Sequence, residues 1–273
     1  MNRRLPTILI NGTLVVFAVL TIFPLLWMVS VSFMHPGEAS AFPPPLFPAK
    51  ATWNNYHELF ERAGMGRNLL NSLAIATALT LLSLGFNLSA GYAFAKLRFR
   101  GRDKLFQYLL GALVIPAQVA MIPLFLMMKS MHLVNTYGGV ILPTAASVFG
   151  IFLVRQYARS IPDDLLEAAR LDGAGEFYIF SRIVLPLLKP IVVTLAIFTF
   201  LASWNDFMWP LIVLSDQEWQ TAPVAIAGLS REHVQDNELM MAGSVVTILP
   251  VLILFLVLQR HYIQGLLLGS VKG

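Results

Sequence analysis

The sequence predicts an all-α integral membrane protein, built as a single domain of six transmembrane helices. Hydrophobic residues make up 57% of the 273 positions and charged residues only 12%, whereas about a quarter of the residues in a soluble domain are charged. Several mainly apolar stretches exceed the ~18 residues that indicate a membrane-spanning helix. Cysteine is absent, which excludes disulfides, thiolate nucleophiles and cysteine-based metal sites.

Six apolar spans follow one another between polar or basic loops. The first contains no Asp, Glu, Lys or Arg between Arg4 and Glu38. It is longer than the apolar core of a signal peptide and ends without a small-residue cleavage site, so we expect an uncleaved first helix. The expected spans of the single domain 1–273 cover about residues 8–33, 69–95, 105–128, 138–154, 191–214 and 239–258.

Prolines are expected to interrupt some of these spans, because proline removes a backbone donor and clashes with the preceding helical turn. Pro116 and Pro123 are expected to break the third span, and Pro143 lies near the start of the fourth. In a transporter such breaks can form hinges and cavities, but a static bend is the alternative interpretation of each. In the loop after the first span, residues 54–62 can form a short interfacial helix.

Lysine and arginine gather in the loops on one side of the predicted bundle. All but five of the 19 lie in residues 1–7, 96–104, 155–190 and 259–273. Because loops rich in Lys and Arg tend to stay in the cytoplasm, we expect both termini and the loop 155–190 on the cytoplasmic side. The chain is therefore expected to be a multi-pass protein of the cytoplasmic (inner) membrane.

Residues 160–190 form a cytoplasmic loop whose sequence predicts a helix–glycine–helix unit. Ser160 is expected to cap the first helix, and two aspartates follow in its first turn. Gly173 is placed to end this helix in a left-handed conformation. A second helix is expected over residues 176–185 and is stopped by Pro186.

A recognisable pattern runs through this loop. The chain reads Glu167-Ala168-Ala169, then Asp172-Gly173-Ala174, then Ile183-Val184-Leu185-Pro186. This pattern resembles the EAA loop, the coupling helix loop of permease subunits in binding-protein-dependent ABC importers. The alternative, on physical grounds alone, is an amphipathic helix at the membrane surface that only supports the bundle.

The resemblance extends over most of the chain. Further segments that look like the carbohydrate, maltose-type branch of this family are Pro116-Ala117-Gln118, Phe152-Leu153 with Arg155-Gln156, Trp204-Asn205-Asp206, and the ending Gly269-Ser270-Val271-Lys272-Gly273.

The resemblance implies a transmembrane permease subunit of an ATP-driven ABC importer for a sugar or oligosaccharide, forming half of the solute pathway. The EAA loop would dock on a separate ATPase, and Val271, Lys272 and Gly273 would reach toward the ATPase dimer. The implied partners are a second permease subunit in a heterodimer, two ATPase subunits and an extracytoplasmic solute-binding protein. ATP and Mg²⁺ would bind to the ATPase, and this chain would carry no cofactor.

Asp206 is the only ionisable residue well inside a predicted span. An ionised group near the membrane centre costs at least ~2.5 kcal/mol, so such groups usually face a wet cavity or a partner. One interpretation puts Asn205 and Asp206 along the solute path, with Trp204 or Trp209 stacking on a sugar ring and Gln118 as a further contact. The alternative ends the fifth span early, near Pro210, and leaves Asp206 at the outer interface.

Motifs for catalysis or metal binding are missing from the sequence. No phosphate-binding Gly-x-x-x-x-Gly-Lys-Ser/Thr run occurs, so the chain cannot hydrolyse ATP itself. The five histidines are scattered without ligand spacing, so we expect neither a metal site nor an enzyme. The positive charge follows the membrane topology, so nucleic acid is not an expected partner.

Two other transporter classes remain open. An ABC permease for glycerol phosphate or another polar solute would need Lys or Arg facing the solute, and none of the six predicted spans contains one, although the partner subunit could supply it. An ion-gradient secondary transporter would need intramembrane acidic residues for ion coupling, and only Asp206 is available.

Overall fold

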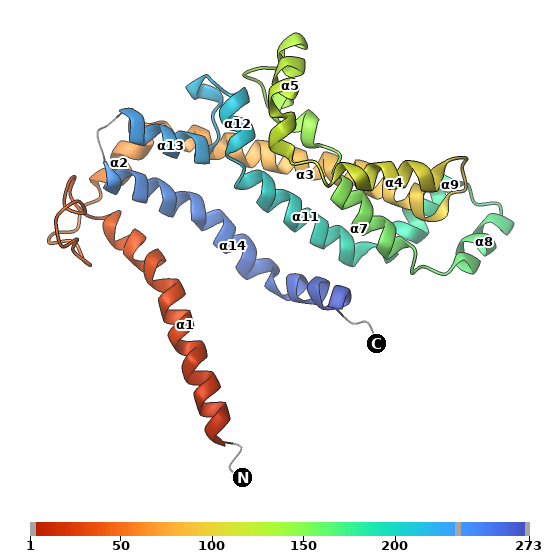
Figure 1. Ribbon diagram of the computed structural model, residues 1–273, viewed down its shortest axis with the longest axis horizontal. Coiled ribbons are helices and arrows are strands. Elements are labelled where there is room, and N and C mark those ends of the chain that lie inside the picture. The colour runs from red at the N-terminus through yellow and green to blue at the C-terminus, as the bar shows by residue number, and fades with distance from the viewer. Residues whose placement is uncertain (1–3, 233–235, 271–273) are drawn as a thin grey trace. The chain divides into compact units, whose positions relative to one another are not determined.

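The structure is a computed structural model that describes the backbone of residues 4–232 and 236–270 (Figure 1). Within those ranges the chain forms helices joined by turns and loops, without a β-strand. The all-α prediction is confirmed. The chain divides into two compact units: unit 1 comprises Met1–Leu69 and Ala222–Leu252, and unit 2 comprises Leu70–Thr221 and Ile253–Gly273.

Unit 1 combines the N-terminal helix with the start of the C-terminal one. Its elements are α1 (Arg4–Val31), α2 (Asn54–Glu61), the first residues of α3 (Met65–Lys96), α13 (Ala222–Glu232) and the first half of α14 (Asn237–Ser270). The short helix predicted over residues 54–62 is confirmed as α2, to within one residue.

The core of unit 1 joins α2, α13 and α14. Leu59, Met65 and Leu239 are buried in it, together with Ala222 and Ala242. By contrast, only 6% of the most apolar stretch of α1 is buried. An apolar helix this exposed within its own chain is suited to a lipid or protein environment, not to water.

Polar side chains hold the loop between α1 and α2. The amide of Asn55 donates to the carbonyls of Ser32 (2.9 Å) and Met34 (2.8 Å). The carboxylate of Glu38 accepts a hydrogen bond from the backbone N–H of Ala49 (2.6 Å). This backbone hydrogen bond is the main reason that the pKa of Glu38 lies below its usual range.

Unit 2 contains the remaining helices. In chain order they are the rest of α3, α4 (Arg102–Ala112), α5 (Ala117–Ser130), α6 (Tyr137–Ile141), α7 (Val148–Ala158), α8 (Asp163–Leu171), α9 (Glu176–Tyr178), α10 (Leu185–Leu187), α11 (Lys189–Trp204), α12 (Met208–Val213) and the end of α14. A π-helical turn over Ile179–Val184 joins α9 to α10, and 3₁₀ turns occupy Leu142–Thr144 and Gln217–Trp219.

Three segments in the described part of the chain are each long and apolar enough to cross a membrane: Ile10–Val31, Met65–Lys96 and Asn237–Val257. Three further candidates are pairs of helices bent against each other. The bends are 100° between α4 and α5, 44° between α6 and α7, and 79° between the α9–α10 segment and α11. If each bent pair is one crossing, the described residues hold up to six candidates, and their membrane boundaries stay predictions.

The third and fourth predicted spans, 105–128 and 138–154, are therefore bent helix pairs and not straight helices. The third breaks at Pro116, as predicted, because this proline precedes the first residue of α5. The prediction that Pro123 also breaks this span is wrong, since α5 continues through it. A proline inside a helix removes one hydrogen bond and can bend the helix without ending it.

The fifth predicted span, 191–214, is not one helix either. α11 ends at Trp204, and residues 205–207 form a turn before α12. The amide of Asn205 donates to the carbonyl of Leu201 (2.9 Å), which also accepts the backbone N–H of Asn205. Asp206 therefore follows the end of a helix instead of lying within one.

α3 and α7 pack closely because α3 has a glycine where they meet. A Cβ atom on Gly91 would lie 2.5 Å from the Cβ atom of Val154, so no larger side chain fits without a shift. Around this contact, Leu88, Leu166 and Ile179 form a core that joins α3, α7, α8 and the π-helical turn. The loop around α8 therefore packs against an apolar core of unit 2.

Arg155 fixes the start of α4 against α7. Its guanidinium carbon lies 3.9 Å from the centre of the Phe106 ring, and its Nε donates to the carbonyl of Phe94 (3.2 Å). One of its terminal nitrogens is 3.8 Å from the carboxylate of Asp103. These contacts supply the partners that a largely buried cation requires.

Candidate functional site

Two features of unit 2 correspond to the sites predicted from the sequence. One is the segment 160–190, called the EAA loop below, and the other is a cavity beside Asp206. Within unit 2, α8 and α9 lie at the end where α4 begins (Figure 1). The EAA loop contains α8, α9, the π-helical turn and α10.

The start of α8 differs from the prediction. The helix begins at Asp163 with Pro162 in the capping position, and the hydroxyl of Ser160 donates to the carbonyl of Tyr157 at the end of the preceding turn. Ser160 is therefore not the cap. The ammonium group of Lys96 on α3 holds the segment that leads into α8.

Lys96 makes two close contacts with this segment. Its Nζ atom donates to the carbonyl of Ile161 (2.5 Å) and to the carboxylate of Asp163 (2.6 Å). Only 4% of the Lys96 side chain is exposed, against 73% for Asp163. The hydrogen bond from Lys96 holds the pKa of the Asp163 carboxyl below its usual range.

The end of α8 follows the prediction. Gly173 has φ +86°, the left-handed conformation expected after a helix C-terminus. The N–H of Gly173 bonds to the carbonyl of Arg170, and the N–H of Ala174 bonds to the carbonyl of Ala169. This pair of hydrogen bonds is the Schellman arrangement, in which glycine avoids the strain that a Cβ atom would add.

The second helix of the EAA loop is longer than predicted. It runs from Glu176 through the π-helical turn to Leu187, so the prediction that Pro186 stops it is wrong. The N–H of Leu185 bonds to the carbonyl of Phe180, five residues earlier, which widens the turn just before the proline. The wider turn lets the helix continue past Pro186, and the 79° bend comes two residues later.

The EAA-loop residues identified from the sequence lie on the outside of unit 2. Glu167, Ala168, Asp172, Gly173 and Pro186 are exposed, and Ala169, Ala174, Ile183 and Leu185 are half-buried.

Two apolar side chains of the loop are also exposed. Leu171 is 89% and Phe177 is 82% exposed, and they flank the Gly173 turn. Exposed apolar side chains beside small residues suit a protein contact more than a solvated face. Sequence reasoning missed both, because an isolated Leu or Phe near the membrane carries no distinctive signal.

A carboxylate ties the two helices of the loop to each other and to α3. The Nε atom of Arg170 donates to Oε1 of Glu176 (2.7 Å), and the hydroxyl of Tyr92 on α3 donates to Oε2 (2.8 Å). The hydrogen bond from Arg170 is the largest of the effects that lower the pKa of Glu176. The carboxylate is therefore charged at neutral pH and accepts both hydrogen bonds.

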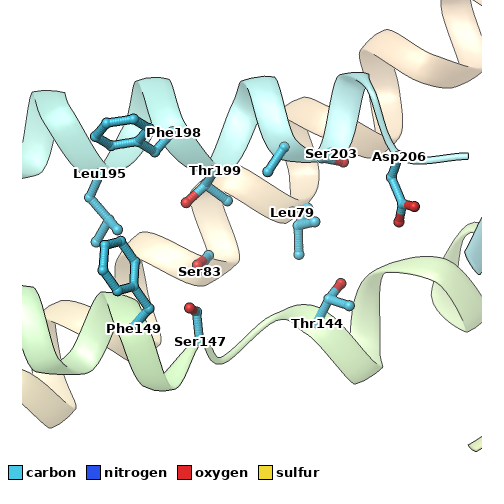
Figure 2. Close-up of a pocket in the computed structure, with 11 residues that line it drawn as sticks. Leu79, Ser83, Thr144, Ser147, Phe149, Leu195, Phe198, Thr199, Ser203 and Asp206 are labelled. Atoms are coloured by element: carbon cyan, nitrogen blue, oxygen red, sulfur yellow. The ribbon is translucent and has the colours of Figure 1, made fainter. Parts of the chain in front are cut away.

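The cavity beside Asp206 has a volume of about 400 Å³. Its described lining combines hydroxyl, carboxylate, aromatic and aliphatic groups from α3, from the α6–α7 segment and from α11 with the turn that follows it (Figure 2). The polar members are Ser83, Thr144, Ser147, Thr199, Ser203 and Asp206, and the apolar ones are Leu79, Phe149, Leu195, Phe198 and Ala202.

Figure 2 shows the hydroxyls of Ser83 and Ser147 on the side of the cavity opposite α11. Between α3 and α7, the buried amide of Asn87 donates to the Ser83 hydroxyl (2.7 Å) and accepts from the backbone N–H of Ser147 (3.0 Å). Hydroxyl, carboxylate and aromatic groups in one cavity can bind a polyol by hydrogen bonds and by contact with the apolar faces of its rings.

The residues predicted for a solute path are only partly brought together. Asp206 lines the cavity, but Trp204 is buried and stacks on Phe200 at 5.9 Å between ring centres. Asn205 turns its amide to its own helix, and Gln118 is exposed near the start of α5. A role of Trp204, Asn205 and Gln118 in the solute path stays a prediction.

The hydroxyl residues of the cavity were not identified from the sequence. Thr199 and Ser203 are four residues apart on α11, and Ser83 and Asn87 are four apart on α3, so each pair shares a helix face. This spacing of polar residues within apolar spans was the available signal. Only their convergence from separate helices distinguishes them from single hydroxyls that bond to their own helix backbone.

Two other predictions concern the tail and metals. Val271, Lys272 and Gly273 lie outside the described residues. Within the described part of the chain, no group of three or more His, Asp or Glu could hold a metal ion.

Comparison with known proteins identifies the family. Residues 87–267 match the family described as binding-protein-dependent transport system inner membrane component. The chain belongs to this family. The matched segment contains α7 to α12 and most of the cavity lining.

Relatives cover nearly the whole chain. The chain is 40% identical over 259 residues to the arabinooligosaccharides transport system permease protein AraQ of Halalkalibacterium halodurans, covering 94% of this chain and 93% of that protein. It is 32% identical over 275 residues to the sn-glycerol-3-phosphate transport system permease protein UgpE of Yersinia pestis, covering 97% of both.

One solved structure has the same fold. A chain from a bacterial ABC transporter involved in the import of the acidic polysaccharide alginate superposes with a TM-score of 0.84, at 25% sequence identity, over 96% of this chain and 99% of that one. The predicted permease fold and inner-membrane location are confirmed. Members of this family are transport subunits and are not enzymes themselves.

Proposed function

We propose that the chain is a permease subunit of an ATP-driven importer for a sugar or oligosaccharide. The single observation that carries this proposal is the 40% identity to AraQ over almost the full length of both chains. The cavity supports it, because its hydroxyls and Asp206 offer hydrogen bonds to a polyol and its two phenylalanines offer ring contacts.

In this proposal the chain forms a heterodimer with a second permease and lines half of the solute path. Two ATPase subunits hold ATP and Mg²⁺, and an extracytoplasmic binding protein delivers the solute. Both termini and the EAA loop face the cytoplasm. The exposed Glu167, the small residues around Gly173, and the apolar Leu171 and Phe177 form the surface that docks on the ATPase.

A permease for glycerol phosphate is the second candidate, and the similarity to UgpE favours it. A phosphate would require Lys or Arg near the solute. The 11 described residues that line the cavity include neither. A neutral polyol therefore fits this half of the path better. An ion-gradient transporter fits less well, since Asp206 is the only acidic residue in that lining.

The docking proposal is tested by copurification in detergent with the candidate ATPase. Gly173→Asp puts a Cβ atom at φ +86°, where a non-glycine residue costs ~1–2 kcal/mol. Gly101→Asp adds the same charge at a similar φ of +83°, at the start of α4 outside the EAA loop, with no atom within 4 Å of its Cβ. We expect wild type and Gly101→Asp to retain the ATPase and Gly173→Asp to lose most of it.

Other outcomes separate the alternatives. If both variants retain the ATPase, docking lies elsewhere on the chain. If wild type itself retains none, the ATP-driven proposal fails, and a gradient-driven transporter becomes the leading account.

A further inference from the structure

The EAA loop is attached to α3 by polar contacts at both ends of α8. Before α8, Lys96 holds the carbonyl of Ile161 and the carboxylate of Asp163. After α8, Tyr92 holds the carboxylate of Glu176, which Arg170 on α8 also holds. The two α3 residues are four apart, so they lie on the same helix face, one turn from each other.

Both of these α3 side chains are buried. Tyr92 is 4% exposed, and so is the side chain of Lys96. A buried phenol and a buried ammonium each need a partner, because an unsatisfied polar group in a low-dielectric site is costly. Displacing α8 alone would break both contacts, so α8 and the end of α3 are expected to move together.

The same helix forms a wall of the cavity. Leu79 and Ser83 on α3 line the cavity, and Tyr92 is nine positions after Ser83, which is about 14 Å along an α-helix. α3 runs from Met65 to Lys96 without a break and contains no proline. A displacement at its end is therefore carried along the helix to Ser83.

A second contact passes the displacement to the neighbouring wall. Asn87, between Ser83 and Tyr92 on α3, holds the backbone N–H of Ser147, which also lines the cavity. Other routes from the EAA loop lead along α7, which ends at Ala158 before the loop, and into α11 through the 79° bend after Leu187. The route through α3 is the one in which Lys96 and Tyr92 hold the segments at both ends of α8.

We propose that Tyr92 and Lys96 are positioning residues that transmit movement of the EAA loop to the cavity wall through α3. This inference rests on the proposed function, since it needs an ATPase that moves the loop. It goes further by naming the two side chains through which ATP-driven movement reaches the solute path. Neither residue touches the solute.

The absence of cysteine allows a direct test in the complete complex with the partner permease and the ATPase. Ser203→Cys puts a single, nearly isosteric thiol on the cavity wall in this chain. The partner subunits are used in cysteine-free form. Otherwise, the modification rate of a parent complex without Ser203→Cys is subtracted as background. The rate of modification by a small maleimide is measured with and without ATP and vanadate.

The test compares four backgrounds that carry this thiol. Tyr92→Phe removes one hydroxyl, and Lys96→Met removes one ammonium group with a side chain of similar length. Their double variant removes both contacts. Tyr178→Phe, at an exposed tyrosine of the same loop, is the matched control.

We expect ATP and vanadate to change the modification rate at least about fivefold in wild type and in Tyr178→Phe, the lower end of typical coupling between sites. In the double variant we expect a change below about twofold, while the ATPase still copurifies and hydrolyses ATP. Lys96→Arg, which keeps a cation at the contact, is expected to restore most of the response lost in Lys96→Met.

Three results would overturn the proposal. A double variant with the full nucleotide response means that movement reaches the cavity by another route. Variants that lose the ATPase mean that Tyr92 and Lys96 serve docking and not transmission. A wild-type complex without ATPase, or without any nucleotide response, means that the proposed function is wrong and that the positioning roles fall with it.

Discussion

At the scale of single residues, Asn87 organises the wall of the cavity. Its side chain is fully buried, and its amide joins the hydroxyl of Ser83 on α3 to the first backbone N–H of the α7 segment at Ser147. Gly150 makes room for this amide, because a Cβ atom there would overlap the Asn87 side chain. The contact therefore sets the distance between two helices that line the cavity.

Replacing Asn87 by leucine keeps a similar volume and removes both hydrogen bonds. The N–H of Ser147 then has no acceptor at this site, and an unsatisfied buried donor costs about 1–3 kcal/mol. We expect a lower unfolding temperature in detergent. Ser89→Ala is the control, since the Ser89 hydroxyl is exposed and bonds only to its own helix at Gly85. Equal stability of Asn87→Leu and wild type would contradict the structural role.

Asp163 gives a prediction for pH. The hydrogen bond from Lys96 lowers its folded-state pKa, so the contact stabilises the protein above the unfolded pKa of about 3.9 and is lost as the pH falls through the folded value. We expect Asp163→Asn to lower the unfolding temperature at pH 7 and pH 5 alike. Below about pH 4 the difference from wild type should shrink.

The control for this measurement is Asp164→Asn, at the adjacent carboxylate in the first turn of α8. A difference between Asp163→Asn and wild type that stays constant down to about pH 2 would show that the Lys96 contact does not depend on the charge of Asp163.

Asp206 is the carboxylate of the cavity, and its replacement tests the solute path. If Asp206 accepts hydrogen bonds from a polyol, Asp206→Asn replaces a charged acceptor by a neutral one. A loss of ~1.4 kcal/mol of binding free energy lowers the affinity for the solute tenfold. We expect roughly a tenfold lower uptake at low solute concentration. Asp216→Asn, at an exposed aspartate outside the cavity lining, is the control. Unchanged uptake and affinity in Asp206→Asn would remove it from the path.

At the scale of elements, the close contact between α3 and α7 depends on Gly91. Gly91→Ala puts a methyl group 2.5 Å from the Cβ atom of Val154, and such overpacking typically costs 1–3 kcal/mol. Gly85→Ala on the same helix meets nothing within 4 Å, and alanine favours helix by up to ~1 kcal/mol. We expect opposite shifts of the unfolding temperature. Equal shifts would contradict the packing of these helices.

The sequence predicts elements well where a local signal decides them. Gly173 ends α8 as expected because a left-handed residue after a helix favours glycine whatever the surroundings. Pro116 breaks the third span for a similar local reason. Ser160 does not cap α8, because its hydroxyl bonds to the carbonyl of Tyr157 and the helix begins only at Asp163. No local pattern reveals the contact of Ile161 with Lys96, which is far away in the sequence.

The absence of a local signal also explains the helix ends that the sequence did not predict. Pro186 does not stop its helix, since a π-helical turn precedes it, and π-helical turns have no dependable sequence signature. The predicted span 191–214 followed the apolar composition, but α11 ends at Trp204. The amide of Asn205 then bonds back to the carbonyl of Leu201. Composition indicates how many segments are apolar and does not indicate where each helix ends.

At the scale of the whole molecule, the apolar composition of the chain predicts the all-α architecture. The two candidate sites differ in how much of each could be identified from the sequence. The EAA loop was identified from its motif, which lies in one continuous segment. The cavity was identified only through Asp206, because Ser83, Ser147 and Thr199 come from three separate helices. A site assembled from single hydroxyls needs the fold before its members can be recognised.

Each unit exposes apolar surface that another molecule must cover in the membrane. Most of α1 is exposed within its own unit, and so are several large side chains of α5, such as Val119 and Ile122. In a membrane these surfaces are covered by lipid or by a second subunit. This agrees with a chain that is one component of a larger transport complex.

The measurement that tests the central claim most directly is solute uptake into vesicles that contain the complete complex, with the binding protein outside together with an oligosaccharide that it binds. We predict uptake that requires ATP inside the vesicle, persists in Gly101→Asp and is lost in Gly173→Asp. Uptake that an ion gradient drives without ATP, or that Gly173→Asp leaves unchanged, would contradict the account.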